Sequence, residues 1–218
     1  SKSILDSQIL VLPGGFSAGD EPEGAGKFIE LVFRHPQVAE ALMEFLDEKR
    51  GLILGIGNGF QALVRLGLLP YGEIRTMGAG SPLLTENRIG RPVSRFVRIK
   101  IVSTLSPWFS NVQVGQVYAV PVACREGRFV ATAREMEELL TRGQIATQYI
   151  DWDNRPSGNY PYNPSGSHEG VESLTSPDGR ILGRMGHEER ITAGTALNFN
   201  LPELRRQGIA RAGISYFL

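Results

Sequence analysis

Residues 51–62 read GLILGIGNGFQA, and this stretch decides the fold. Residues 51–56 form a short apolar run that is typical of a buried β-strand. Residues 60–68 carry apolar side chains at helical spacing, so they predict a helix. A strand that passes into a helix through closely spaced glycines predicts a sharp turn at the edge of a sheet in an α/β domain.

The rest of the chain adds further strands and helices around this turn. Strands are predicted at residues 8–12, 93–102, 117–122, 145–150 and 180–185, and helices at residues 27–50 with a break at Pro36, 135–142 and 201–215. Residues 153–167 are rich in Pro, Gly, Asn and Asp and predict a long irregular loop, which in a compact domain is often functional. The pattern predicts one α/β domain over residues 1–218, with a mainly parallel sheet flanked by helices.

Composition excludes several classes of partner. The 218 residues suffice for one domain with a sizeable core, and 41% of them are hydrophobic. Lys+Arg and Asp+Glu both number 23, so we expect neither nucleic acid nor a membrane surface as a partner. No apolar run reaches the length of a membrane span. The single cysteine, Cys124, excludes an internal disulfide and fits a cytoplasmic location.

The turn itself has three interpretations. A G-x-nucleophile-x-G turn lifts one side chain above the sheet edge, but the nucleophile position here is Gly57, which has no side chain. Residues 55–59 alone favour a plain glycine-rich turn. Gly57, Gly59 and Ala62 also match a dinucleotide fingerprint. That match lacks the following strand with an acidic residue at its end, so the nucleotide-binding hypothesis is weaker.

Two further motifs carry polar groups that chemistry needs. Residues 13–16, PGGF, place successive glycine N–H groups at a strand end, an arrangement that binds anions or simply turns the chain. Residues 187–190, HEER, place a carboxylate two residues after a histidine, which suits either a base with its orienting acid or an exposed turn. Cys124 fits a core cysteine better than a thiol activated by Arg125. No spacing of His or Cys predicts a metal site, and we expect no cofactor.

Five motifs occur in one order along the chain, at residues 13–20, 55–61, 121–129, 163–167 and 186–190. In this order they resemble class I glutamine amidotransferases. The similarity is greatest to the glutaminase domain of phosphoribosylformylglycinamidine synthases, the formylglycinamidine ribonucleotide synthases of purine biosynthesis. The resemblance runs from about residue 7 to the C-terminus. It implies a flavodoxin-like fold that lacks the first strand-helix-strand unit of the family and is therefore truncated at its N-terminus.

The resemblance also implies a role for six positions. They are Gly57 in place of the nucleophilic cysteine, His187 as general base, Glu189 as the acid that orients it, Gly15 and Asn58 as oxyanion-hole donors through their backbone N–H groups, and Gln61 beside the bound glutamine. In the family the thiolate attacks the glutamine side-chain amide and forms a thioester. The released ammonia then passes to an ATP-dependent synthetase domain, the expected partner, which aminates formylglycinamide ribonucleotide.

Two departures from the family pattern affect function. Gly57 cannot form the thioester, and Cys124 with Arg125 replaces the His-Gly pair that the family has before Glu126. The sequence therefore predicts a glutaminase domain that is inactive in glutamine hydrolysis. The alternative is a non-catalytic structural or regulatory remnant of that domain, which binds a partner. The two hypotheses differ in the expected position of His187, which faces Gly57 in a disarmed site and bulk solvent in a dismantled one.

Overall fold

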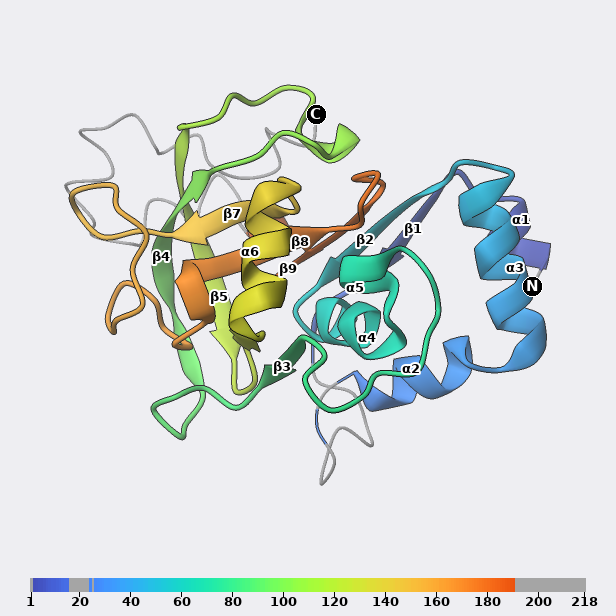
Figure 1. The fold of residues 1–218 in the computed structure, drawn as a ribbon, viewed down its shortest axis with the longest axis horizontal. Coiled ribbons are helices and arrows are strands. Elements are labelled where there is room, and N and C mark those ends of the chain that lie inside the picture. Colours follow the sequence, from blue (N-terminus) through green and yellow to red (C-terminus); the bar gives the residue numbers. More distant parts are fainter. Residues whose placement is uncertain (1, 16–23, 25, 191–218) are drawn as a thin grey trace.

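The computed structural model describes residues 2–15, 24 and 26–190 (Figure 1). Its helices and strands are, in chain order, α1 (Lys2–Leu5), β1 (Ile9–Leu12), α2 (Lys27–Phe33), α3 (Pro36–Asp47), β2 (Leu52–Ile56), α4 (Asn58–Leu66), α5 (Leu68–Tyr71), β3 (Leu83–Thr85), β4 (Val93–Ile101), β5 (Val117–Cys124), β6 (Arg128–Val130), α6 (Ala133–Thr141), β7 (Ile145–Tyr149), β8 (Val171–Thr175) and β9 (Ile181–Arg184). Short 3-10 turns lie at Pro107–Phe109, His168–Gly170 and Glu188–Arg190.

A seven-stranded sheet in the order β1-β2-β9-β8-β7-β4-β5 organises the described residues, and β3 and β6 form a separate pair. Strands β1, β2 and β9 are parallel, as expected for residues 8–12 and 52–56. The four remaining neighbouring pairs of this sheet are antiparallel. The α/β class is therefore confirmed, but the expectation of a mainly parallel sheet is corrected to a mixed one. The hydrophobic pattern of the sequence indicates where the strands lie, but it does not indicate whether neighbouring strands run parallel or antiparallel.

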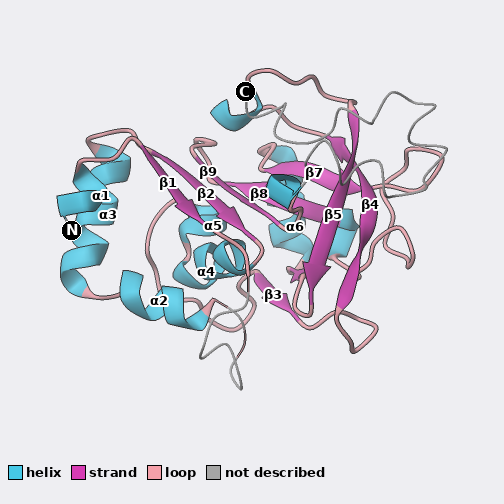
Figure 2. Ribbon diagram, turned by 180° about the vertical axis from the view of Figure 1, so that it is seen from behind, coloured by secondary structure: helices cyan, strands magenta, loops and turns pink. Residues whose placement is uncertain are grey.

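Helices cover one face of the sheet, with α4, α5 and α6 in front of the strands in Figure 1. The main core lies between these layers and contains the fully buried side chains of Phe45, Phe60 and Leu63. On the opposite face, Phe109 packs with residues of β2 and β9 around Leu182. Figure 2 shows the molecule from that side, with β4 and β5 in front of α6. Burial of both faces explains why β2 reads as a continuous apolar run.

Several predicted elements appear at the expected places. The helical segment 27–50 is divided at Pro36, which is the first residue of α3, because proline is well tolerated in the first turn of a helix. The predicted helix 60–68 begins two residues earlier, at Asn58, and ends at Leu66 before Gly67. The short α1, β3 and β6 and the buried β8 were not predicted. The predicted helix 201–215 lies outside the described residues.

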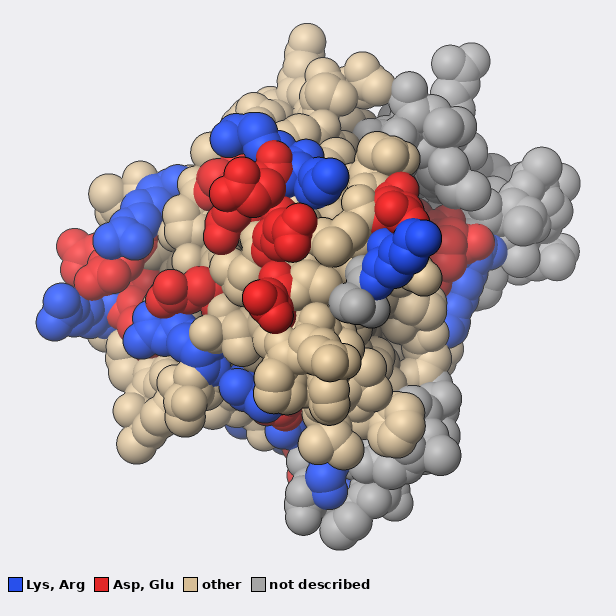
Figure 3. Space-filling model, turned by 90° about the vertical axis from the view of Figure 1, so that its right-hand side faces the viewer, with Lys and Arg blue, Asp and Glu red and all other residues tan. Residues whose placement is uncertain are grey.

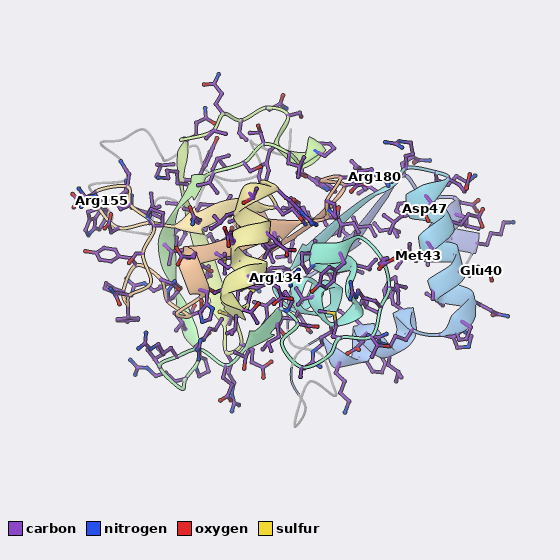
Figure 4. The ribbon with its side chains drawn as sticks, viewed as in Figure 1. Glu40, Met43, Asp47, Arg134, Arg155 and Arg180 are labelled. Atoms are coloured by element: carbon purple, nitrogen blue, oxygen red, sulfur yellow. The ribbon has the colours of Figure 1, made fainter. Side chains whose placement is uncertain are left out.

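The outer surface near α3 carries charges of both signs. Figure 3 shows this face, on which acidic and basic side chains lie interspersed. Arg180, in the turn between β8 and β9, points toward the end of α3 (Figure 4) and donates to the carbonyl of Leu46. Its Nε atom also lies 2.6 Å from Asp178 of the same turn, which fixes the arginine side chain where it reaches α3. Within the described ranges, no helix has the length and apolar character required to cross a membrane.

Candidate active site

The turn between β2 and α4 is a sharp elbow centred on Gly57. Its backbone has φ 52° and ψ −107°, a conformation that glycine tolerates and other residues adopt only with strain. The Gly57 N–H donates to the carbonyl of Arg184 in β9 at 2.8 Å. Its carbonyl accepts from the N–H of Gln61 in the first turn of α4 at 3.0 Å. The neighbouring strand and the helix therefore hold the elbow without a side chain at residue 57.

His187 lies directly over this elbow. Only 1% of the residue is exposed, and a Cβ atom at residue 57 would lie 3.2 Å from its Cε1 and 3.3 Å from its Nε2. Its Nδ1 lies 2.7 Å from Oε1 of Glu189. When Nδ1–H donates to this carboxylate, the Nε2 of the neutral ring keeps its lone pair on the side of residue 57. This arrangement suits a general base with its orienting acid.

The backbone around His187 leaves little freedom to its ring. Its N–H donates to the carbonyl of Pro121 in β5 at 2.8 Å. A Cβ at Gly14, after β1, would lie only 2.5 Å from the His187 Cε1, so a larger residue there would displace the ring. Gly14 is thus part of the site, although the sequence interpretation gave Gly14 no role of its own and assigned the oxyanion role in this loop to Gly15. The close packing of Gly14 against a distant histidine has no local signature in the sequence.

Glu189 stays in its charged form near neutral pH. Burial alone would raise the pKa of its carboxyl group, but the hydrogen bond from His187, a backbone hydrogen bond and the charge of Arg190 together outweigh burial and lower the pKa. A carboxyl group whose pKa is depressed on folding stabilises the fold above its unfolded pKa, and this contribution is lost as the pH falls through the folded value. The pair is therefore intact at neutral pH.

The two predicted oxyanion-hole residues lie at the same end of the parallel strands. Gly15 follows β1 with φ 124°, and Asn58 opens α4 directly after β2. The parallel register pairs Leu12 with Gly55, so both loops leave the sheet at one edge. The N–H groups of the first turn of a helix have no acceptor within that helix. The oxyanion role of these two residues stays a prediction.

Gln61 is buried beside the elbow, and its side-chain Nε2 donates to the carbonyl of Glu126. The turn that contains Glu126 is held on two sides. The Oδ1 of Asn87 accepts from the Gly127 N–H at 3.1 Å, and Oγ of Ser167 donates to the Gly127 carbonyl at 3.1 Å. The 163–167 motif therefore supports the neighbourhood of Gln61 through this turn. That structural role, and the participation of Asn87, were not predicted.

A groove of about 820 Å³ adjoins the same turn, between α2, α4 and residues 76–86. Glu126 lines it together with Glu30, Arg34, Arg65 and Glu86, so charges of both signs face the groove. Among the residues that the structure describes, no three His, Cys, Asp or Glu side chains form a group that would hold a metal ion.

Cys124, at the end of β5, has surroundings different from those of His187. Its Sγ lies 3.9 Å from Asn87 Oδ1, and burial raises the pKa of its thiol to about 12.

We predict that Cys124 does not replace the missing nucleophile. At pH 8 its thiolate fraction, and so its alkylation by iodoacetamide, should be roughly 10³-fold below that of a free cysteine. The urea-unfolded chain gives the reference rate, and equal rates in the folded and unfolded chains would contradict the prediction.

A side chain at the elbow should cost stability. We predict that Gly57→Ala lowers the free energy of unfolding by about 1–3 kcal/mol, because a Cβ there strains the backbone and approaches the His187 ring closely. Urea unfolding of the variant measures this loss. Gly158→Ala is the matched control, since a Cβ at Gly158 would meet nothing within 4 Å. A Gly57→Ala variant as stable as this control would show that the elbow is relaxed.

A family model, described as CobB/CobQ-like glutamine amidotransferase domain, matches residues 1–215. The chain is 34% identical over 192 residues to "Phosphoribosylformylglycinamidine synthase subunit PurQ" of Methanococcus maripaludis, covering 87% of this chain and 67% of that relative. The protein of the same name from Aquifex aeolicus is 31% identical over 189 residues, covering 87% and 75%. The solved structure of PurLQS from Thermotoga maritima aligns with a TM-score of 0.63 at 25% identity, covering 85% of this chain and 70% of that one.

Proposed function

This chain belongs to the family of CobB/CobQ-like glutamine amidotransferase domains, and we propose that it is the glutaminase part of a phosphoribosylformylglycinamidine synthase whose hydrolytic step is disarmed at Gly57. The relatives that carry the synthase name support the purine-synthesis assignment. Its substrate class would be glutamine. Its partner would be the ATP-dependent synthetase part of the same enzyme, a pairing that the PurLQS likeness supports.

The mechanism of the family explains what the chain lacks. A thiolate at residue 57 would attack the amide carbon of glutamine, and His187 would protonate the departing nitrogen to release ammonia. Water, with its proton taken by the same Nε2, would then cleave the thioester to glutamate. Without a side chain at Gly57 no thioester forms. What this chain offers is a base, its orienting carboxylate and the backbone donors of the elbow.

The single observation that carries the proposal is the position of His187. It is buried, paired with Glu189 and 3.3 Å from the place of the missing Cβ at Gly57. A remnant that kept only a partner-binding surface would have no use for this arrangement. The site therefore favours a disarmed glutaminase over a dismantled one.

The charges of the groove argue against a nucleotide ligand. Phosphate groups bind where positive side chains or backbone N–H groups of a helix start converge, whereas Glu30, Glu86 and Glu126 face this groove beside two arginines. Such a mixture suits a zwitterion such as an amino acid. The strand β3, next along the chain after α5, also lies outside the main sheet, so the βαβ unit of a dinucleotide fold does not follow the elbow.

Ammonia release from glutamine tests the proposal. We expect the purified chain to release ammonia no faster than about 10³–10⁴ times the rate in water. This is the rate enhancement that hydrolases retain when their nucleophile is removed. His187→Ala controls for contaminating glutaminase, since a contaminant would be unaffected by the variant. Turnover at the 1–10³ s⁻¹ typical of working enzymes, lost in His187→Ala, would overturn the disarmed assignment.

A further inference from the structure

A buried cluster of three charged side chains lies beside the candidate site and takes no part in the chemistry described above. Arg184 ends β9, Glu172 lies in β8, and Glu188 follows His187; at most 1% of each is exposed. Nη2 of Arg184 contacts Oε1 of Glu188 and lies 3.5 Å from Oε2 of Glu172. Burying such a cluster is costly, and apolar side chains of similar volume generally give equal or greater stability. Stability alone therefore does not account for the cluster.

The cluster is connected to both halves of the site by backbone hydrogen bonds. Oε1 of Glu172 accepts from the N–H of Gly186 at 2.6 Å and of Met185 at 3.1 Å, the two residues that precede His187. The carbonyl of Arg184 accepts the N–H of Gly57 at 2.8 Å. The side chain of Glu172 therefore holds the segment that carries the base, and the backbone of Arg184 holds the elbow.

The carboxylate of Glu172 is itself held on its other side. Its Oε2 accepts from Oγ of Thr147, which in turn lies 2.6 Å from Oγ of Ser173. A Cβ at Gly186 would lie within 3.1 Å of all three charged side chains, so the backbone wraps closely around the cluster. A carboxylate fixed by this many contacts is a rigid support for the two N–H groups that it accepts.

We propose that Glu172 is a positioning residue. Its carboxylate, paired with the Arg184 guanidinium, accepts hydrogen bonds from the N–H groups of Met185 and Gly186 and thereby holds His187 over residue 57. The proposal deepens the proposed function and rests on it, because it takes His187 as the base of the glutaminase site. Glu172 touches no reacting atom, and its effect passes through the backbone that leads to His187.

The test uses Gly57→Cys as a background, because the reactivity of the introduced thiol reports the position of His187 without glutamine. A thiol beside an imidazole has a lowered pKa and reacts at acidic pH, whereas an unperturbed thiol has a pKa near about 8.5. We expect Glu172→Leu to slow iodoacetamide alkylation at pH 6.5 by about tenfold or more and to shift the rate–pH profile toward that of a free cysteine. Glu172→Gln keeps a carbonyl acceptor and should retain most of the rate.

The controls separate positioning from general stability. Leu42→Ala removes buried core volume in α3 and should lower stability while leaving the alkylation profile unchanged. The chain without the Gly57→Cys change gives the background of Cys124, whose pKa of about 12 makes it slow. If Glu172→Leu does not fold, Glu172→Asp serves instead, since its shorter side chain places the carboxylate too far from Gly186.

The outcomes distinguish this proposal from the glutaminase assignment. An unchanged rate–pH profile in a folded Glu172→Leu or Glu172→Asp variant would overturn the positioning role. The Gly57→Cys background could fail to hydrolyse glutamine while the profile still shifts in these variants. That result would support the positioning role and contradict glutamine as the substrate.

Discussion

Gly57→Cys is expected to raise the rate of glutamine hydrolysis by this chain by about 10³-fold or more, because it supplies the one group that the site lacks. Removal of a nucleophile from a hydrolase triad costs up to about 10⁶-fold in turnover, and its return should recover part of that factor. The introduced Cβ would lie 3.3 Å from Nε2 of His187, so the sulfur, one bond further, comes within reach of the base.

The gain will be smaller than the full factor for a physical reason. The same Cβ lies 3.2 Å from Cε1 of His187, so the ring must shift by a few tenths of an ångström, and φ of 52° strains any residue other than glycine. The variant should therefore be less stable than the parent chain while it gains activity. This opposition of stability and activity is common at strained sites.

Two matched variants test the cause of the gain. Gly57→Ser places a hydroxyl group at the same position, but serine has no thiolate and should gain far less. Gly57→Cys with His187→Ala should lose most of the gained rate, because the thiol then has no base. A Gly57→Cys variant that is folded, alkylates readily and still releases no ammonia would contradict glutamine as the substrate.

The sequence predicted those parts of the fold that its apolar pattern encodes locally. Strand β2 and helix α4 appear as a buried apolar run followed by helical periodicity, and their boundaries are correct within two residues. Strand β8 was missed because three of its five residues are polar, although all five are buried. Glu172 and Thr175 are buried there only because partners far along the chain, such as Arg184 and Gln144, satisfy them. Such partners are invisible to a local pattern.

The candidate site was predicted from the order of the motifs, and the structure brings Gly57, His187 and Glu189 together as expected from that order. The supports of the site were not predicted. Gly14 is needed because an imidazole ring from a distant segment packs on it, and Glu172 because two backbone N–H groups point at it. A signal was present for Arg184, since an arginine within an otherwise apolar strand requires buried partners.

Arg184→Met is expected to lower the free energy of unfolding by about 3–5 kcal/mol, the usual cost of removing one partner from a buried ion pair. Methionine is apolar and of similar length, so packing is largely kept. What remains is two buried carboxylates, Glu172 and Glu188, without the cation that lay between them. Urea unfolding at pH 7 measures the loss, and Arg142→Met, which removes an exposed ion pair with Glu138, should cost less than about 1 kcal/mol.

The pH dependence of this loss identifies its cause. Without Arg184 two buried carboxylates, those of Glu172 and Glu188, have no cation between them, and an uncompensated buried charge disfavours the folded state. Such groups destabilise the fold above the unfolded pKa and cease to do so when protonated, so the deficit of Arg184→Met should shrink as the pH falls from 7 toward 4. Adding Glu188→Leu should recover part of the stability at pH 7, since it removes one uncompensated charge and leaves Glu172 to accept the Gly186 N–H. A deficit that is the same at both pH values, and that Glu188→Leu enlarges, would mean that packing and not charge accounts for the loss.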